Sequence, residues 1–212
     1  MVQKTDKKRK NNKINDMVFV SLFAAVIAVS AQIAVPVGAI PFTLQTMAVL
    51  VAAALLGLKW GVASIAVYIL LGVVGLPVFS GFKGGIGALV GPTGGYIVGF
   101  LLVGFIVGLA VDKLGRKFTV MILSMISGLV MCYTFGTLWF VFSTGTDFLS
   151  ALMLCVVPYI IFDVMKIIGS ALLVSSLNKV LTLKFSKIVL KSNFIYYDFL
   201  KYRNGKSDCG VV

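Results

Sequence analysis

Two side chains of opposite charge, Asp163 and Lys166, lie within an otherwise apolar run of the chain. Their spacing of three places both on one face of a helix. A charge at the centre of a lipid bilayer costs about 2.5–3.5 kcal/mol on insertion scales, so we expect both to face the interior of a helical bundle. The pair is either a structural ion pair that holds this segment in the bundle or part of a ligand site. In a ligand site the carboxylate would accept N–H groups and the ammonium would donate to a carbonyl oxygen.

Polar residues also open the apolar segment that begins at Phe42. Thr43 and Gln45 would lie in its first turn, where helix N–H groups are free. Thr43 is suited to capping the helix. Capping does not explain Gln45, which is a candidate for hydrogen bonding to a ligand. Gln32, near the end of the preceding apolar segment, is a candidate of the same kind.

Residues 76–95 are rich in glycine and proline and cannot sustain a regular helix. Unpaired backbone amides are not tolerated in lipid, so this passage lies at an aqueous face or inside the protein, as a lid on a binding site or as an ordinary surface loop. Its one cation, Lys83, either attracts a ligand carboxylate or is solvated. Phe79 and Phe82 either cover an apolar ligand ring or anchor the loop. Tyr96, which follows, suits an outward-facing cavity or the lipid interface.

Composition identifies the class of protein. The chain has 212 residues, of which 59% are hydrophobic and 12% are charged, about half the charged fraction of soluble proteins. The absence of His excludes His catalysis and the usual His-containing metal sites. The three Cys residues show no CxxC spacing, and no phosphate-binding P-loop motif occurs. We therefore expect an all-α membrane protein that is not an enzyme and has no cofactor, no metal and no ATP site.

Six apolar segments approach the length of about 20 residues that a membrane-spanning helix needs. Lys59 leaves so short a turn between the second and third that these two must form a hairpin. The predicted spans are residues 17–35, 42–58, 60–76, 93–111, 118–142 and 149–177.

The basic residues predict the orientation of these spans. With six spans, every Lys and Arg except Lys83 and Lys166 falls on the side that holds both termini. Cytoplasmic loops are the ones enriched in Lys and Arg, so both termini are predicted in the cytoplasm and the glycine-rich loop outside. The net charge of +12 then reflects topology and contact with anionic lipid rather than nucleic-acid binding. The predicted parts are a basic cytoplasmic tail over 1–16, expected to be disordered, a six-helix domain over 17–180, and a basic, aromatic cytoplasmic tail over 181–212.

Small residues recur on the first span at Ala24, Ala28 and Ala31. A spacing of four between small residues permits close helix packing. This stripe could face its own bundle or a partner protein.

Taken in order, these motifs resemble the BioY family, the biotin-specific substrate-binding S components of energy-coupling factor (ECF) transporters. The resemblance spans about residues 20–180. It is carried by Ala-Val-Ser-Ala-Gln-Ile at 28–33, Pro-Phe-Thr-Leu-Gln-Thr at 41–46, Gly-Leu-Pro-Val-Phe at 75–79, Gly-Gly-Ile-Gly at 84–87, Gly-Pro-Thr-Gly-Gly-Tyr at 91–96 and Asp-x-x-Lys at 163–166.

The resemblance implies six helices around an outward-facing vitamin site in the cell membrane. It implies that Asp163 and Lys166 bind the ureido ring of biotin, and that Ala24 and Ala28 contact a transmembrane coupling subunit. It also implies that two cytosolic ATPases supply ATP hydrolysis. With the residues discussed above, the predicted substrate-binding set is Asp163, Lys166, Gln45, Thr43, Tyr96, Lys83 and Phe79.

Two alternatives belong to other classes. One is an S component or self-sufficient carrier for another small metabolite, which ligand competition would distinguish. The other is an intramembrane enzyme, for instance a lipid-modifying transferase. An enzyme of that kind needs several carboxylates or a nucleophile–base pair, and Asp163 is the one carboxylate deep in a predicted span.

Overall fold

The computed structural model describes residues 2–35 and 40–179, with side chains described from Ile14 onward. The chain forms two compact units, and the second begins at Ser175. The elements discussed below belong to the first unit, up to Val174. The predicted tail over residues 181–212 lies outside the described residues.

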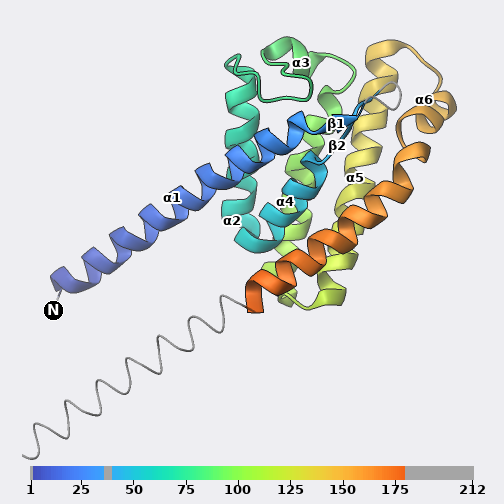
Figure 1. Cartoon of the computed structure of the whole chain (residues 1–212). Coiled ribbons are helices and arrows are strands. Elements are labelled where there is room, and N and C mark those ends of the chain that lie inside the picture. The colour runs from blue at the N-terminus through green and yellow to red at the C-terminus, as the bar shows by residue number, and fades with distance from the viewer. Residues whose placement is uncertain (1, 36–39, 180–212) are drawn as a thin grey trace, which may run out of the picture. The chain divides into compact units, whose positions relative to one another are not determined.

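The described chain consists mainly of helices (Figure 1). Helix α1 (Val2–Gln32) leads into strand β1 (Ala34–Val35), which pairs antiparallel with β2 (Phe42–Thr43). The elements that follow are α2 (Gln45–Val73), α3 (Ile86–Val90), α4 (Gly94–Leu114), α5 (Phe118–Thr144), α6 (Phe148–Cys155) and a 3-10 turn (Val157–Tyr159). The last described helix covers residues 160–179.

The basic N-terminal stretch differs from its prediction. Because α1 begins at Val2, residues 2–16 are helical rather than disordered. No Gly or Pro interrupts this stretch, and Lys and Arg are good helix formers, so the apolar helix continues outward through the charged residues.

Five described helical segments are long and apolar enough to cross a membrane. One of them, α2, is divided by Gly57, whose φ of 74° and ψ of −170° are not helical. Counting its two halves separately gives the six predicted segments. The chain is therefore a multi-pass membrane protein with the predicted all-α fold.

The two halves of α2 form the predicted hairpin, with the turn at Gly57 rather than at Lys59. A Cβ atom added to Gly61 would lie 2.9 Å from the Cα of Ala53. A straight helix would separate these residues by about 12 Å, at 1.5 Å per residue. The neighbouring helix stabilises the turn, because Asp112 accepts the N–H of Leu58 at 2.9 Å.

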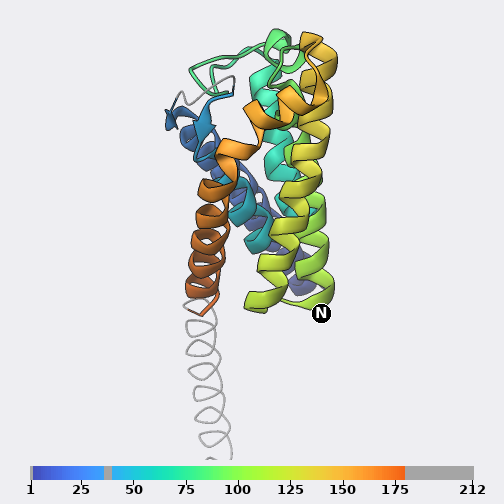
Figure 2. The same ribbon diagram turned by 90° about the vertical axis from the view of Figure 1, so that its right-hand side faces the viewer.

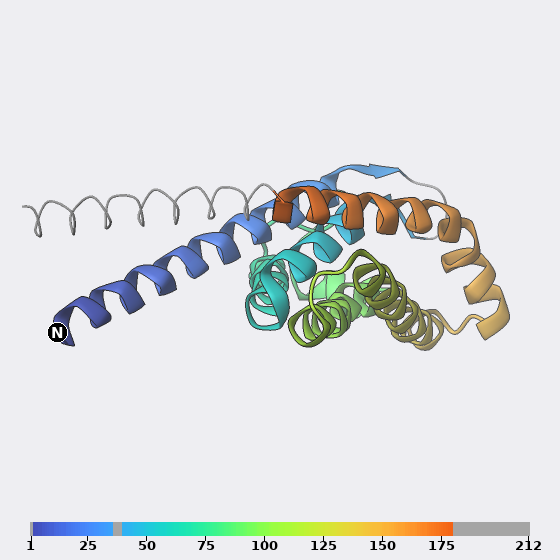
Figure 3. The same ribbon diagram turned by 90° about the horizontal axis from the view of Figure 1, so that it is seen from below.

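Helix α4 lies at the centre of the packing. It contacts both α2 and α5, and α1 packs along α2. Figure 2 shows α4 and α5 side by side along their length. Figure 3 shows the same helices nearly end-on, with α1 running beside α2. The apolar core between them includes Val49, Ile65, Val103 and Met125, all fully buried.

Three local predictions are corrected. The second span begins at Gln45 rather than Phe42, because Phe42 and Thr43 form β2. The N-cap residue of the helix is Leu44, which makes no side-chain hydrogen bond to it, so the predicted cap at Thr43 is not formed. The glycine-rich loop contains one short helix, α3. The last predicted span is interrupted by the 3-10 turn at Pro158, whose ring and missing N–H disfavour a continuous helix.

Candidate functional site

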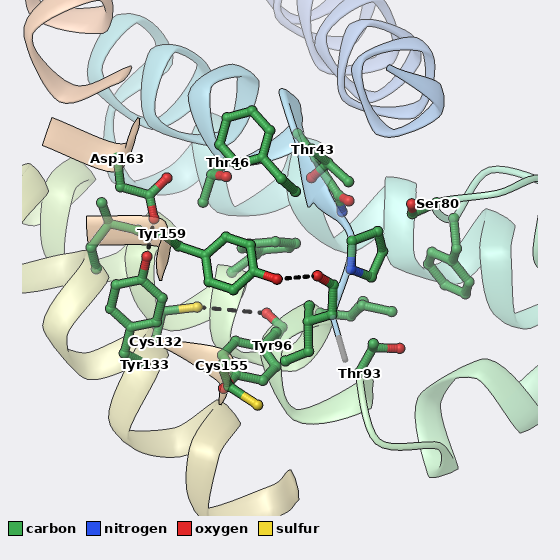
Figure 4. A pocket seen from close by; sticks show the side chains of 18 of the residues that line it. Thr43, Thr46, Ser80, Thr93, Tyr96, Cys132, Tyr133, Cys155, Tyr159 and Asp163 are labelled. Atoms are coloured by element: carbon green, nitrogen blue, oxygen red, sulfur yellow. Dashed lines mark hydrogen bonds between the residues drawn. The ribbon is translucent and has the colours of Figure 1, made fainter. Parts of the chain in front are cut away.

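A cavity in the first unit brings together residues far apart in the sequence (Figure 4). Its walls come from β2 and the start of α2, the loop after α2, α4, α5, the region around the 3-10 turn, and the last described helix. All seven predicted substrate-binding residues line it: Thr43, Gln45, Phe79, Lys83, Tyr96, Asp163 and Lys166. The seven candidates thus line one cavity.

Asp163 and Lys166 form the ion pair that their spacing predicts. The Nζ of Lys166 lies 2.8 Å from Oδ1 of Asp163, and both side chains are more than nine-tenths buried. The same Nζ donates to Oγ1 of Thr46 at 3.1 Å and lies 3.9 Å from the ring centroid of Phe42. The pair is a structural link, as the first interpretation of the sequence expects, and it also lines the cavity; its binding of a ligand stays a prediction.

Tyr133 supplies a second donor to this carboxylate. Its hydroxyl, on α5, donates to Oδ2 of Asp163. The two carboxylate oxygens therefore face different partners, an ammonium and a phenol. A ligand with N–H groups would meet an acceptor already oriented from both sides.

Gln45 is buried at the start of α2. Its Nε2 donates to the hydroxyl of Tyr68 at 2.8 Å. Tyr96, in the first turn of α4, shares a hydrogen bond of 3.0 Å with Thr137 of α5. Gln45 is held by the second half of α2 and Tyr96 by α5, so the cavity walls are ordered by hydrogen bonds as well as by packing.

The glycine-rich loop supplies one wall and part of the mouth. Phe79 is buried, and its ring meets that of Tyr68 edge-on at 5.6 Å. The backbones of Phe79 and Lys83 exchange two hydrogen bonds, of 2.9 and 3.2 Å. Lys83 lines the cavity but is exposed, as a residue at its mouth would be. Phe82 is 72% exposed and is not among the lining residues that the structure describes.

Sequence reasoning missed two tyrosines, Tyr133 and Tyr159, that line the cavity. Tyr159 follows Pro158 in the 3-10 turn, and its hydroxyl donates to the carbonyl oxygen of Ile40. Pro158 was an available signal for a break in the last span. Nothing local marks Tyr133, because α5 is apolar on all sides and its sequence does not indicate which face points inward.

The two alanines predicted to contact a partner differ in how deeply they are buried. Ala24 is 1% exposed and belongs to the core of this chain. Ala28 is half-buried and packs against that core. The stripe therefore faces its own bundle at Ala24, which was the alternative that spacing alone left open.

The cavity combines an acceptor, donors and apolar walls. At one end lie the carboxylate of Asp163 and the ammonium of Lys166; Phe79, Tyr96 and Phe100 provide apolar surface, and Lys83 adds positive charge at the mouth. This arrangement suits a small molecule with a polar head bearing N–H and C=O groups, an apolar middle and an anionic end.

The chain is similar to known proteins in sequence and in structure. A sequence model of the BioY family matches residues 4–183. The chain is 40% identical to the biotin transporter BioY of Thermotoga maritima over 166 residues, covering 78% of this chain and 97% of that protein. It is 42% identical to the probable biotin transporter BioY of Pyrococcus horikoshii over 154 residues, covering 73% and 90% respectively.

A solved structure is also similar. The crystal structure of the S-component for biotin from an ECF-type ABC transporter superposes with a TM-score of 0.75 at 27% sequence identity, covering 80% of this chain and 93% of that one. The family match covers most of the chain, and both relatives align over most of their own length. The chain therefore belongs to the BioY family.

Proposed function

We propose that this chain is the biotin-binding membrane subunit of an ECF-type transporter in the prokaryotic cell membrane. The observation that carries the proposal is the buried Asp163–Lys166 pair, which lines a cavity rather than being enclosed by apolar side chains. Burying two charges is costly, and a polar ligand head gives the pair a function beyond its own attraction.

In this proposal the ureido ring of biotin lies at Asp163 and Lys166. Its N–H groups donate to the carboxylate, and its carbonyl oxygen accepts from the ammonium. The apolar part of the ligand lies along Phe79 and Tyr96, and its carboxylate points to Lys83. Gln45 and Thr43 line the same cavity as further polar contacts.

The proposal includes partners that this chain needs for transport. A transmembrane coupling subunit and two cytosolic ATPases would supply the energy. Both termini would lie in the cytoplasm and the cavity would open outward, as the distribution of Lys and Arg predicts. Contact with the coupling subunit would involve α1 near Ala28, which is half-buried, whereas Ala24 is closed off within the bundle.

Equilibrium binding to the purified full chain in detergent tests the assignment. We expect selective, submicromolar binding of biotin, with thiamine and riboflavin as control ligands. A folded sample that binds neither biotin nor its close analogues would contradict the assignment. Preference for another vitamin would instead support the S-component alternative with a different ligand.

A further inference from the structure

Gln32, the last residue of α1, contacts the loop that closes the cavity. Its Nε2 donates to the carbonyl oxygens of Pro77 at 3.3 Å and Phe79 at 3.2 Å. Its Oε1 accepts the backbone N–H of Phe82 at 3.0 Å. A longer contact of 3.4 Å joins Nε2 to the carbonyl of Ala28 within α1. One amide side chain thus links the end of α1 to both arms of the turn over residues 77–82.

The loop adopts a backbone conformation that needs such support. Phe82 has a φ of 57°, and it is the one non-glycine residue with a positive φ in the described part of the chain. Bulky residues seldom adopt this region. The side chain of Phe82 is 72% exposed, so packing contributes little to holding it. The hydrogen bond from its N–H to Gln32 therefore constrains the turn together with the two backbone hydrogen bonds between Phe79 and Lys83.

The position of this turn determines the wall of the cavity. Phe79, within the turn, and Lys83, directly after it, both line the cavity. The ring of Phe79 packs against Tyr68, whose hydroxyl accepts from Gln45. A shift of the turn would move Phe79 away from these contacts and open the mouth at Lys83.

We propose that Gln32 is a positioning residue that fastens this loop to α1 and thereby slows release of the bound ligand. The identity of the ligand, biotin, rests on the proposed function above; the attachment of the loop does not. Gln32 itself is not among the residues that line the cavity, so it acts through the loop.

The chemistry of the side chain explains why a glutamine serves here. A carboxamide offers two donors and an acceptor without charge. Methionine at this position fills a similar volume but makes none of these hydrogen bonds. Glutamate retains the acceptor for the N–H of Phe82 but presents no donor to the two carbonyls. Methionine therefore removes the hydrogen bonds to both arms of the turn, whereas glutamate removes only those to the carbonyls of Pro77 and Phe79.

The test compares biotin dissociation rates and backbone amide exchange of the full chain in lipid nanodiscs. In Q32M we expect amide exchange over residues 77–85 to accelerate and biotin to dissociate about tenfold faster, as expected for lost neutral hydrogen bonds. In Q32E we expect Phe82 to keep its protection while dissociation still accelerates. Ser21→Ala is the matched control, because Ser21 is exposed on α1 and its hydroxyl bonds only to Val18 among the described residues.

Biotin dissociation from Q32M at the rate of the S21A control would overturn the proposal. Faster amide exchange with unchanged dissociation would overturn it equally, because the loop would then move without affecting the ligand. If Q32M does not fold, Q32E decides by the same two measurements. If the unmodified chain binds no biotin, the proposed function fails, and amide exchange alone decides whether Gln32 fastens the loop.

Discussion

At the scale of single residues, the Asp163 carboxylate is held through both of its oxygens. It is buried, faces Lys166 on one oxygen and receives the hydroxyl of Tyr133 on the other. An unpaired charge in this position would be strongly unfavourable. The ion pair therefore compensates both charges, and a ureido head would join groups that are already oriented.

Replacing Asp163 with Asn tests this role. The substitution keeps the shape of the side chain but removes the anionic acceptor. We expect biotin affinity to fall by about 1.5–3 kcal/mol, the usual contribution of a charge-assisted hydrogen bond, which corresponds to roughly ten- to 150-fold. Isothermal titration of the purified variant measures the change.

The matched control is Asp147→Asn. Asp147 is exposed and caps α6 by accepting the N–H of Leu149 at 3.1 Å. Asparagine caps a helix about as well, so this variant should bind biotin normally. Normal affinity in a folded D163N sample would leave Asp163 with the structural ion pair as its only role.

The role of Lys83 can be isolated by changing the ligand as well as the residue. Exposed ion pairs contribute little, so we expect Lys83→Gln to weaken biotin binding by only about two- to fivefold. Binding of biotin methyl ester, which lacks the carboxylate, should not change. Competition titrations with both ligands provide the comparison, and an equal loss for acid and ester would exclude a contact with the ligand carboxylate.

At the scale of elements, the position of the Phe79 ring depends on a glycine of α2. A Cβ atom added to Gly72 would lie 2.0 Å from the ring of Phe79. Gly72→Ala must therefore push the ring away from the cavity wall. We expect a loss of stability of about 1–3 kcal/mol, as overpacking usually causes, together with weaker biotin binding.

Thermal unfolding and biotin titration of G72A measure these two effects. Gly87→Ala is its control, because a Cβ atom at Gly87 meets nothing within 4 Å, and its φ is not in the positive range. If G72A behaves like G87A, the ring of Phe79 is not confined between α2 and the loop.

The two alanines of α1 should separate packing from partner contact. Ala24 is in the core, so Ala24→Leu should destabilise the isolated chain by about 1–3 kcal/mol. Ala28 is half-buried, so Ala28→Leu should spare biotin binding and instead weaken association with the coupling subunit. Thermal unfolding measures the first effect and co-purification with the coupling subunit the second. Loss of stability in both variants would indicate that the whole stripe packs inside this bundle.

At the scale of the whole molecule, the orientation in the membrane can be measured directly. In a Cys209→Ser background, a membrane-impermeant maleimide added to intact cells should label Lys83→Cys but not Lys113→Cys. Cys132 and Cys155 are buried and should stay unlabelled. Lys83 follows α2, whereas Lys113 lies in the last turn of α4, at the opposite end of that helix from the loop. If Lys113→Cys is labelled and Lys83→Cys is not, the orientation in the membrane is the opposite of the predicted one.

Much of the fold could be predicted from local patterns. The six apolar segments are a matter of length and composition, and both can be counted along the chain. The hairpin followed from the short interval between two segments, but its turn lies at Gly57 rather than at the predicted Lys59. Two segment boundaries were predicted less accurately. The second span begins at Gln45 because the residues before it pair with β1 as a strand. The last span is interrupted at Pro158, a single proline in an otherwise apolar segment.

The candidate site was predictable where polar residues were conspicuous. Asp163, Lys166 and Gln45 stand out because polar groups in apolar segments are costly, so their inward direction follows from energetics alone. The shared face of Asp163 and Lys166 followed from helical spacing. The family resemblance implied a single vitamin site and assigned Asp163 and Lys166 to it. Only the structure shows that the other five candidates line the same cavity.

The sequence by itself determined the class of protein, the number of apolar segments and the inward position of its buried charges, because each depends on composition or local spacing. The tertiary structure alone decided which apolar and aromatic faces point inward. It buried Ala24, brought Tyr133 to Asp163 and placed Gln32 against the loop. The physical reason is that lipid and protein core are both apolar, so helices of this kind lack the polar stripe that would indicate their orientation.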